Sequence, residues 1–180
     1  MTILDAVDSV RTVLEKDPAR AVVRIRAEAR LEEGTVAAVR AGAHSLTVDE
    51  PKSVGGTGTG PNPVQMVLSS LASCQAISYR YWSELLGIRL DAITVRVEGD
   101  IDQRGFLGFA EGVPAGTTAV RCTVTVEGPE TPERYEELRR SVDAHCPVLD
   151  VFTMALAVER HLEIGTPAER LGQGPPAAPR

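Results

Sequence analysis

At 180 residues the chain is long enough for one domain with a sizeable hydrophobic core. Its net charge is −6 and its 19 basic residues are scattered along the chain, which excludes the basic surface typical of nucleic-acid-binding proteins. The apolar runs are shorter than the roughly 18 residues of a membrane span, and the N-terminus carries acids where a secretory signal has Lys or Arg. We therefore expect a cytoplasmic protein with neither a membrane nor a nucleic acid as partner.

The N-terminal part is expected to form a short helix followed by three strands. Apolar residues recur every three or four positions over residues 3–15, which predicts an amphipathic helix that ends before Pro18. We expect residues 1–17 to be an appendage packed on the main domain, residues 18–164. Alternating patterns over residues 21–29, 35–39 and 44–48 predict an antiparallel meander with turns at Gly34 and Gly42.

A loop rich in glycine and proline, residues 50–63, leads into a long helix. The spacing of its glycines matches no phosphate-binding fingerprint, so a nucleotide site is disfavoured. Asn62 is expected to cap the helix, Pro63 to occupy its first position, and Gly87 to end it. The first half of this helix is apolar or small on nearly every side, which predicts burial all round. Because the helix is longer than a domain of this size needs to cross its own core, we expect a second subunit to bury part of it.

The C-terminal half is expected to add strands and two further helical segments. Residues 91–102 and 119–127 read as strands that join the first three in one mainly antiparallel sheet of five or six strands. Thr131 and Pro132 open a helix that ends near Ala144, and a short apolar segment follows from Pro147. Residues 157–164 are expected to form a last strand. Residues 165–180 have the composition of a disordered tail.

The three cysteines differ in their surroundings. Cys122 lies inside an alternating strand pattern, where packing is the simpler interpretation. Cys74 lies on a helix stripe that resembles core, and packing and reactivity are about equally favoured there. Cys146 stands where a helix cap would, beside His145 and before Pro147, and both the amide dipoles and the histidine would favour its thiolate. His145 is equally compatible with an ordinary surface position at a helix end.

Several motifs together resemble the OsmC/Ohr family of thiol-dependent peroxidases, over roughly residues 22–163. They are an Arg-x-Gly-x-His segment at residues 40–44, Asp-Glu-Pro at 49–51, Asn-Pro-x-Gln at 62–65, Cys74 twelve residues after Asn62, and a Cys-Pro at 146–147. The resemblance is closer to the OsmC-type branch. It implies an α+β fold in which an antiparallel sheet wraps around a long buried helix, and an intertwined homodimer with active sites at the subunit interface.

The resemblance also implies a function and an order of action. Cys74 would attack an organic hydroperoxide and become a sulfenic acid, Cys146 would resolve it as an intrachain disulfide, and an external dithiol would reduce the pair. Because burial raises the pKa of a thiol, Cys74 would need a cation beside it. The family supplies an arginine from the N-terminal strands, here Arg30 or Arg40, held by a glutamate whose position is occupied by Val64 in this chain.

Two alternatives remain open at this point. A family member that kept the fold and the cysteines but lost efficient turnover would act as a redox-responsive or small-ligand-binding dimer. A metal site built from Cys74, His145 and Cys146 is disfavoured, because the chain has no Cys-x-x-Cys spacing and adjacent ligands rarely converge on one ion. We therefore expect no metal and no cofactor.

Overall fold

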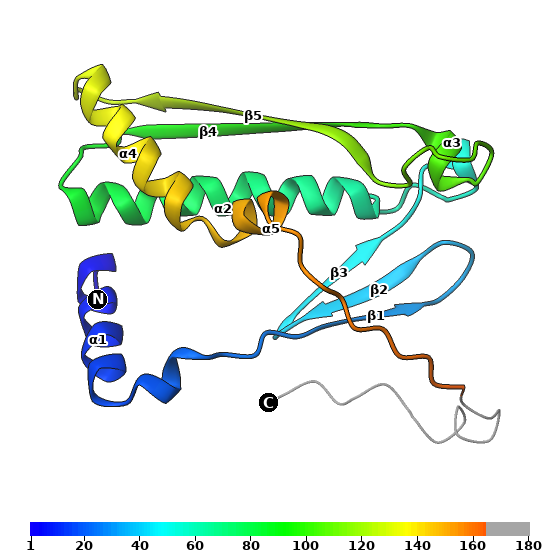
Figure 1. Ribbon diagram of the computed structural model, residues 1–180, viewed down its shortest axis with the longest axis horizontal. Coiled ribbons are helices and arrows are strands. Elements are labelled where there is room, and N and C mark those ends of the chain that lie inside the picture. The colour runs from blue at the N-terminus through cyan, green and yellow to red at the C-terminus, as the bar shows by residue number, and fades with distance from the viewer. Residues whose placement is uncertain (165–180) are drawn as a thin grey trace.

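The computed structural model of the chain describes residues 1–164 (Figure 1). It begins with helix α1 (Ile3–Lys16), which starts in a capping box between Thr2 and Asp5, followed by a single 3-10 turn, η1 (Pro18–Ala21). The helix expected over residues 3–15 is thereby confirmed. None of its residues is buried, so α1 packs only lightly on the remainder of the chain. The expected tail, residues 165–180, lies outside the described residues.

Strands β1 (Ala27–Leu31), β2 (Ala37–Ala41) and β3 (His44–Val48) form the expected antiparallel meander. The first strand was predicted too early, at residues 21–29. Pairing runs from Leu31 opposite Ala37 back to Ala27 opposite Ala41, where β2 ends. Within residues 1–164, no strand lies opposite the residues before Ala27, and an alternating pattern without a partner strand does not form a ladder.

The central helix α2 (Pro63–Leu86) has the predicted ends. The side chain of Asn62 accepts a hydrogen bond from the backbone N–H of Gln65, Pro63 opens the helix, and Gly87 ends it in the left-handed region at φ 61°. Only one stripe of α2 is buried within the chain, namely Leu71, Gln75, Tyr79 and Ser83. The expectation of burial all round is thus wrong for the single chain, where Ile77 is 58% exposed.

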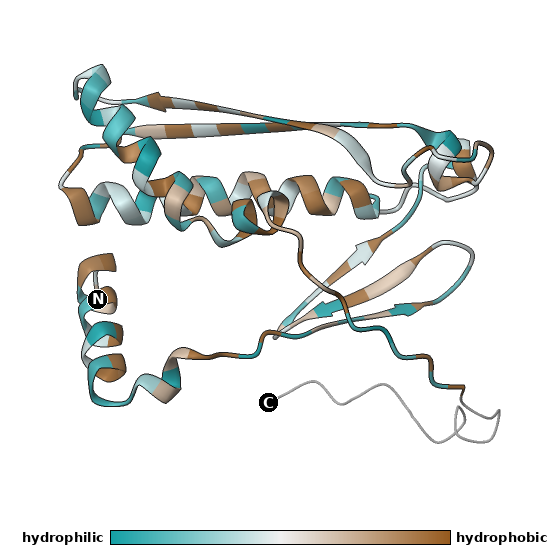
Figure 2. Cartoon of the chain, viewed as in Figure 1, coloured by the Kyte–Doolittle hydropathy of each residue, from teal (hydrophilic) through white to brown (hydrophobic). Residues whose placement is uncertain are grey.

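Strands β4 (Ala92–Ile101) and β5 (Thr117–Glu127) form a separate two-stranded antiparallel sheet, joined through the short helix α3 (Gln103–Phe106). The single sheet of five or six strands was therefore wrong, because no strand of the meander pairs with β4 or β5 in this chain. The β4–β5 sheet runs along α2, and Figure 2 shows hydrophobic and hydrophilic residues alternating along both strands. The alternation places one face of the sheet on the helix.

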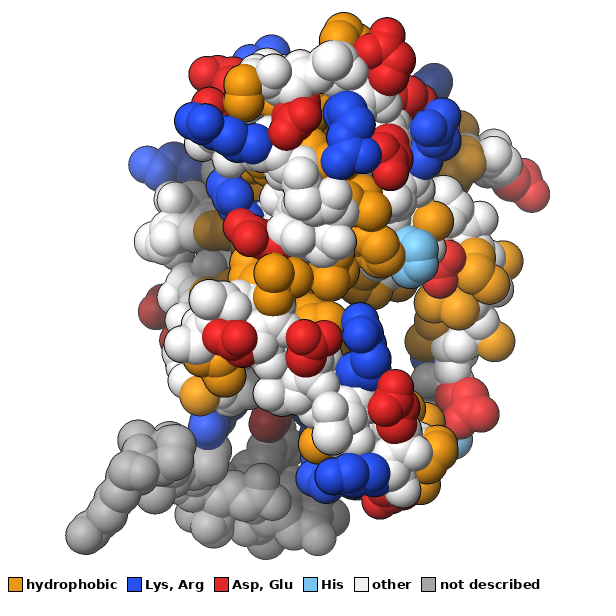
Figure 3. Space-filling model, turned by 90° about the vertical axis from the view of Figure 1, so that its left-hand side faces the viewer, with side chains coloured by type: hydrophobic (Ala, Val, Ile, Leu, Met, Phe, Trp, Pro, Cys, Tyr) orange, Lys and Arg blue, Asp and Glu red, His pale blue; other side chains and the backbone are white. Residues whose placement is uncertain are grey.

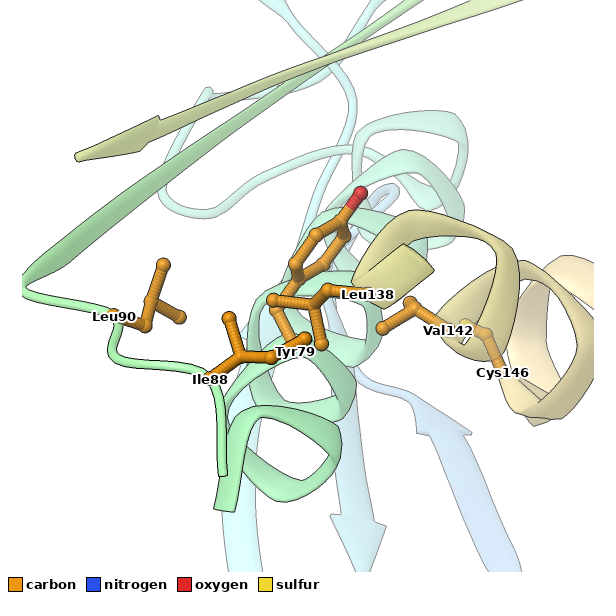
Figure 4. Close-up of a cluster of buried hydrophobic side chains, with 6 residues drawn as sticks. All are labelled: Tyr79, Ile88, Leu90, Leu138, Val142 and Cys146. Atoms are coloured by element: carbon orange, nitrogen blue, oxygen red, sulfur yellow. The ribbon is translucent and has the colours of Figure 1, made fainter. Parts of the chain in front are cut away.

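Helices α4 (Pro132–His145) and α5 (Pro147–Thr153) pack against α2 and complete the core. Figure 4 shows that core, in which Leu138, Val142 and Cys146 meet Tyr79, Ile88 and Leu90. No strand follows α5 in the described part of the chain, so the strand expected at residues 157–164 was wrong. The fold is α+β, with α2 at its centre.

The described residues leave much apolar surface uncovered. A band of hydrophobic side chains crosses the end of the molecule that Figure 3 shows, with acidic and basic side chains above and below it. The meander contributes only Val48 to the buried residues, and Asp49, directly after β3, is buried as well. Among residues 1–164, no helix is long and apolar enough to cross a membrane.

Candidate active site: a pair of thiols between two helices and α2

Cys74 lies in the middle of α2, twelve residues beyond the Asn62 cap, and its side chain is partly buried. A cap at Asn62 fixes where the helix begins and therefore which direction each later residue faces. Position 74 adjoins the buried stripe of α2 and packs against the core cluster. The sulfur is therefore held on a rigid element, at the edge of the protein interior.

Cys146 is the single residue between α4 and α5. The residue before a proline is driven out of the helical region, because the proline ring clashes with its backbone. Cys146 accordingly has φ −85° and ψ 107°, which ends α4, while Pro147 occupies the first position of α5. This break turns the Cys146 side chain into the core, where the residue is only 2% exposed.

The two thiols face one another. The Sγ atoms of Cys74 and Cys146 are 3.4 Å apart, and the Cys146 thiol donates to the Cys74 sulfur. Both cysteines are free. A disulfide bond is about 2.05 Å long, so the two sulfurs need to approach by only about 1.4 Å. The two sulfur atoms are therefore already close to bonding distance.

The local groups around Cys74 act on its pKa in opposite directions. Burial is the largest effect and raises the pKa of the Cys74 thiol above its ordinary value. The backbone N–H of Val148 and the hydroxyl of Ser78 favour the thiolate and lower the pKa, whereas the neighbouring Cys146 raises it. The net effect within one chain is a raised pKa, as expected from the sequence for a buried thiol without a cation.

The two candidate arginines lie on the meander, not beside Cys74. Arg30 is on β1 and Arg40 is on β2, where Arg40 stands opposite Glu28 in the strand register. Among residues 1–164, no arginine contributes to the pKa of Cys74. Val64, at the position for which the motif resemblance implies a glutamate, is the second residue of α2 and is partly buried. The single chain thus brings the two thiols together but does not place Arg30 or Arg40 beside them.

His145 is exposed and contacts Trp82 and its own helix. Its ring lies against Trp82 with the ring centroids 4.3 Å apart and the planes tilted by 35°, and its Nδ1 lies 2.8 Å from the carbonyl oxygen of Ser141. This geometry corresponds to a histidine at the end of a helix and on the surface, one of the two interpretations left open. Among the described residues, no group of three or more His, Cys, Asp or Glu side chains could hold a metal ion.

Asp49 is part of the Asp-Glu-Pro motif, but the sequence analysis assigned no structural role to its side chain. It is buried and follows β3, and its carboxylate accepts hydrogen bonds from the hydroxyls of Thr35, Thr57 and Thr59 and from backbone N–H groups of the glycine-rich loop. These donors, led by the Thr35 hydroxyl, hold the pKa of Asp49 far below its usual range. The sequence signal that could have predicted this role is an aspartate followed by a loop in which Thr and Gly alternate, since such a loop offers hydroxyl and N–H donors to a carboxylate.

Comparison with known proteins identifies the family. Residues 56–160, more than half of the chain, match the family described as OsmC-like protein. The chain belongs to the OsmC-like protein family. This match confirms the resemblance to the OsmC/Ohr family that the sequence motifs indicated. No curated protein matches the chain.

Solved structures of this family share the fold. An OsmC-like protein from Mycoplasma pneumoniae is 19% identical with a TM-score of 0.63, and the alignment covers 73% of this chain and 88% of that one. An organic hydroperoxide resistance protein OsmC from Legionella pneumophila is 19% identical with a TM-score of 0.56, covering 73% and 90%. An organic hydroperoxide resistance protein from Elizabethkingia anophelis, with thiocyanate bound, is 20% identical with a TM-score of 0.57, covering 72% and 88%.

Proposed function

We propose that this OsmC-like protein is a thiol-dependent peroxidase that reduces organic hydroperoxides with Cys74 and Cys146. The observation that carries the proposal is the 3.4 Å separation of the two sulfur atoms at the edge of the core. Membership of a family that includes organic hydroperoxide resistance proteins supports the same reaction class.

The reaction has three balanced steps. The Cys74 thiolate attacks the terminal peroxide oxygen, the O–O bond breaks, and the alcohol leaves with a proton while Cys74 becomes a sulfenic acid. The Cys146 sulfur then attacks the Cys74 sulfur, and water leaves as the disulfide forms. An external dithiol reduces the disulfide and regenerates both thiols. Ser78 and the backbone N–H of Val148 are placed to stabilise the attacking thiolate.

The proposed active unit is a homodimer with α2 of both chains at its centre. Exposed apolar side chains on α2, and a three-stranded sheet with little packing on its own chain, support this arrangement. A small sheet is stable when one face is packed against another element. In the dimer, Arg30 or Arg40 of one chain would lie beside Cys74 of the other and offset the burial that raises its pKa. Recycling by a dithiol requires a reducing compartment, which fits a cytoplasmic protein.

Steady-state peroxide consumption tests the proposal. With cumene hydroperoxide and a dithiol, the wild-type protein is expected to consume peroxide catalytically and Cys74→Ser to show only the background rate. Cys122→Ser is the matched control and should retain the wild-type rate, because Cys122 is on β5 and takes no part in the proposed pair.

A second function is favoured by one observation, the apolar Val64 where the family has a glutamate. Without a carboxylate to hold the arginine, a dimer with the same fold would respond to oxidants or bind a small ligand without efficient turnover. A wild-type consumption rate equal to that of Cys74→Ser, with a stoichiometric ligand retained through purification, would favour this function over the peroxidase.

A further inference from the structure

Helix α4 runs back along α2 and contacts it at both ends (Figure 1). At the start of α4, Arg134 donates to the carbonyl oxygen of Leu86, the last residue of α2. At the end of α4, the ring of His145 lies against Trp82 of α2, with the ring centroids 4.3 Å apart and the planes tilted by 35°. The next residue is Cys146, so this aromatic contact is directly adjacent to the second thiol.

A second contact fixes the orientation of the His145 ring. Its Nδ1 lies 2.8 Å from the carbonyl oxygen of Ser141, one turn earlier in α4. A carbonyl oxygen only accepts hydrogen bonds, so Nδ1 carries a proton and donates it to this bond. One ring nitrogen is thus bonded to α4 while the ring rests on the indole of Trp82, and His145 connects the end of α4 to α2.

Cys146 depends on its neighbours for its position. It belongs to neither helix, since its φ of −85° and ψ of 107° are extended, and its side chain forms no capping hydrogen bond with α5. Pro147 restricts the backbone conformation of Cys146, but it does not set the distance to α2. Val142 anchors the preceding turn of α4 in the core, and the contact of His145 with Trp82 anchors the last residue of that helix.

The geometry of the two thiols makes small displacements important. Their Sγ atoms are 3.4 Å apart, and a disulfide bond is about 2.05 Å long. Cys74 lies in the middle of a 24-residue helix, whereas Cys146 lies at a break between two helices, so freedom at the α4–α5 junction sets how often the sulfurs meet. A displacement of about 1 Å between reacting groups can slow a reaction about a hundredfold.

We propose that His145 is a positioning residue for Cys146. Through its contact with Trp82 it holds the α4–α5 junction against α2 and raises the effective concentration of the Cys146 thiol at Cys74. The role belongs to the ring and acts through the backbone of the adjacent residue. The inference rests on the proposed Cys74–Cys146 pair, but it concerns formation of the disulfide by any oxidant and does not require peroxidase turnover.

The equilibrium of the full-length protein with glutathione tests the proposal without any peroxide. In this exchange the two protein thiols form a disulfide, and oxidised glutathione takes up two electrons and two protons to give two reduced glutathione molecules. Protein is equilibrated over a series of glutathione ratios, alkylated and analysed by mass spectrometry for the Cys74–Cys146 disulfide. His145→Ala should lower the equilibrium constant for this disulfide about fivefold, equivalent to about 20 mV, because the aromatic contact is lost. The side chain of His145 is exposed, so the variant is expected to fold.

Two further variants distinguish positioning from a general loosening of α4. His145→Phe keeps a ring against Trp82 and should stay within about twofold of the wild-type equilibrium constant. Tyr135→Phe is the matched control, because it removes a hydroxyl that donates to the carbonyl oxygen of Arg89 at the opposite end of α4, and it should leave the constant unchanged. An unchanged constant in His145→Ala, an equal decrease in Tyr135→Phe, or no recovery in His145→Phe would overturn the proposal.

The same measurement separates this inference from the proposed peroxidase. A wild-type disulfide that forms in glutathione, in a protein that consumes no peroxide, would contradict the peroxidase alone, and the three variants would still decide the role of His145. Absence of a Cys74–Cys146 disulfide in wild-type protein under oxidising glutathione would overturn both.

Discussion

Pro147 determines the conformation of Cys146 and, through it, the position of the second thiol. By excluding the helical region for the preceding residue, it ends α4 and starts α5 one residue later. Cys74 needs no such device, because its position on α2 follows from the Asn62 cap. Two local sequence signals, a cap and a Cys-Pro dipeptide, thus bring together sulfur atoms that are 72 positions apart.

The first prediction concerns the arginine proposed to offset the effect of burial on the pKa of Cys74. If Arg30 or Arg40 acts across the dimer, changing that one to alanine should raise the pH midpoint of Cys74 alkylation by about one unit. At a fixed pH below the midpoint, the thiolate fraction and the alkylation rate should then fall about tenfold. The rate of Cys74 labelling by iodoacetamide, followed by peptide mass spectrometry over a pH series, measures both quantities.

Arg11→Ala, on the exposed face of α1, provides the control and should leave the midpoint unchanged. An unchanged midpoint in both Arg30→Ala and Arg40→Ala would remove the arginine from the proposed mechanism.

At the scale of elements, the glycine-rich loop is a compact connector between β3 and α2. Asp49 gathers its hydroxyl and N–H groups, and the backbone passes too close to itself for side chains at two positions. A Cβ added at Gly56 would lie 1.8 Å from the carbonyl oxygen of Glu50, and one at Gly60 would lie 2.3 Å from that of Thr47. The loop therefore delivers the chain to Asn62 in one conformation.

Gly56→Ala is expected to lower the free energy of unfolding by about 2 kcal/mol, because the backbone must move to admit the methyl group. Gly116→Ala is the matched control, since a Cβ there meets no atom within 4 Å, and its effect should stay within about 0.5 kcal/mol. Chemical denaturation followed by circular dichroism measures both. Equal stability of the two variants would show that the loop rearranges freely.

Asp49→Asn is expected to destabilise the fold at neutral pH, because an amide presents a donor to groups that themselves donate. The pKa of Asp49 is lowered in the folded state, so its stabilising effect is complete above the pKa of the unfolded chain and is lost as the pH falls below that value. The stability difference between wild type and Asp49→Asn should therefore shrink on acidification. Thermal melts from neutral to acidic pH measure it.

Asp17→Asn, whose side chain makes no capping hydrogen bond, is the control for Asp49→Asn and should follow the wild type at every pH. A difference between Asp49→Asn and wild type that is constant with pH would contradict the assigned role of the carboxylate.

The elements that could be predicted from the sequence are those whose ends are fixed locally. The caps of α2 and α4, with a proline at the first position of each, gave their starts, and Gly87 gave the end of α2. Strands depend on a partner elsewhere in the chain. Residues 157–164 alternate as a strand would but have no neighbouring strand in the described part of the chain, and the meander does not join β4 and β5. A pattern on one segment contains no information about its partner.

At the scale of the whole molecule, one chain leaves large surfaces without a partner. The meander packs little on its own chain, and α2 exposes Val67, Ile77 and Tyr81. The sequence pointed to this from the length and the all-round apolar character of α2. It did not identify Gln75 and Tyr79 as buried residues, because a helix that is apolar on nearly every side does not indicate which side faces the core of its own chain.

Ile77→Asp is expected to shift the protein from dimer to monomer, because a charge would be buried between the two central helices. Phe109→Asp, which changes an exposed residue in the β4–β5 connection, should leave the dimer intact. Analytical ultracentrifugation measures the mass of each species. A wild-type protein that sediments as a monomer would contradict the proposed arrangement.

The pairing of Cys74 with Cys146 is the part of the site that the sequence predicted through its motifs and the structure places at short range. The proposed activating arginine, Arg30 or Arg40, is the part that the single chain does not bring to Cys74 within the described residues, and in the proposed dimer it would depend on contact between two subunits. The order of action of the two thiols is likewise a matter of chemistry and not of position.

Disulfide mapping after a single oxidation shows directly whether Cys74 and Cys146 react as a pair. The fully reduced protein is treated with one equivalent of cumene hydroperoxide, alkylated, digested and analysed by mass spectrometry. We expect an intrachain Cys74–Cys146 disulfide with Cys122 still alkylated, and in Cys146→Ser a sulfenic acid confined to Cys74. Oxidation at Cys122, or a Cys74 that stays a free thiol while peroxide is consumed, would contradict it.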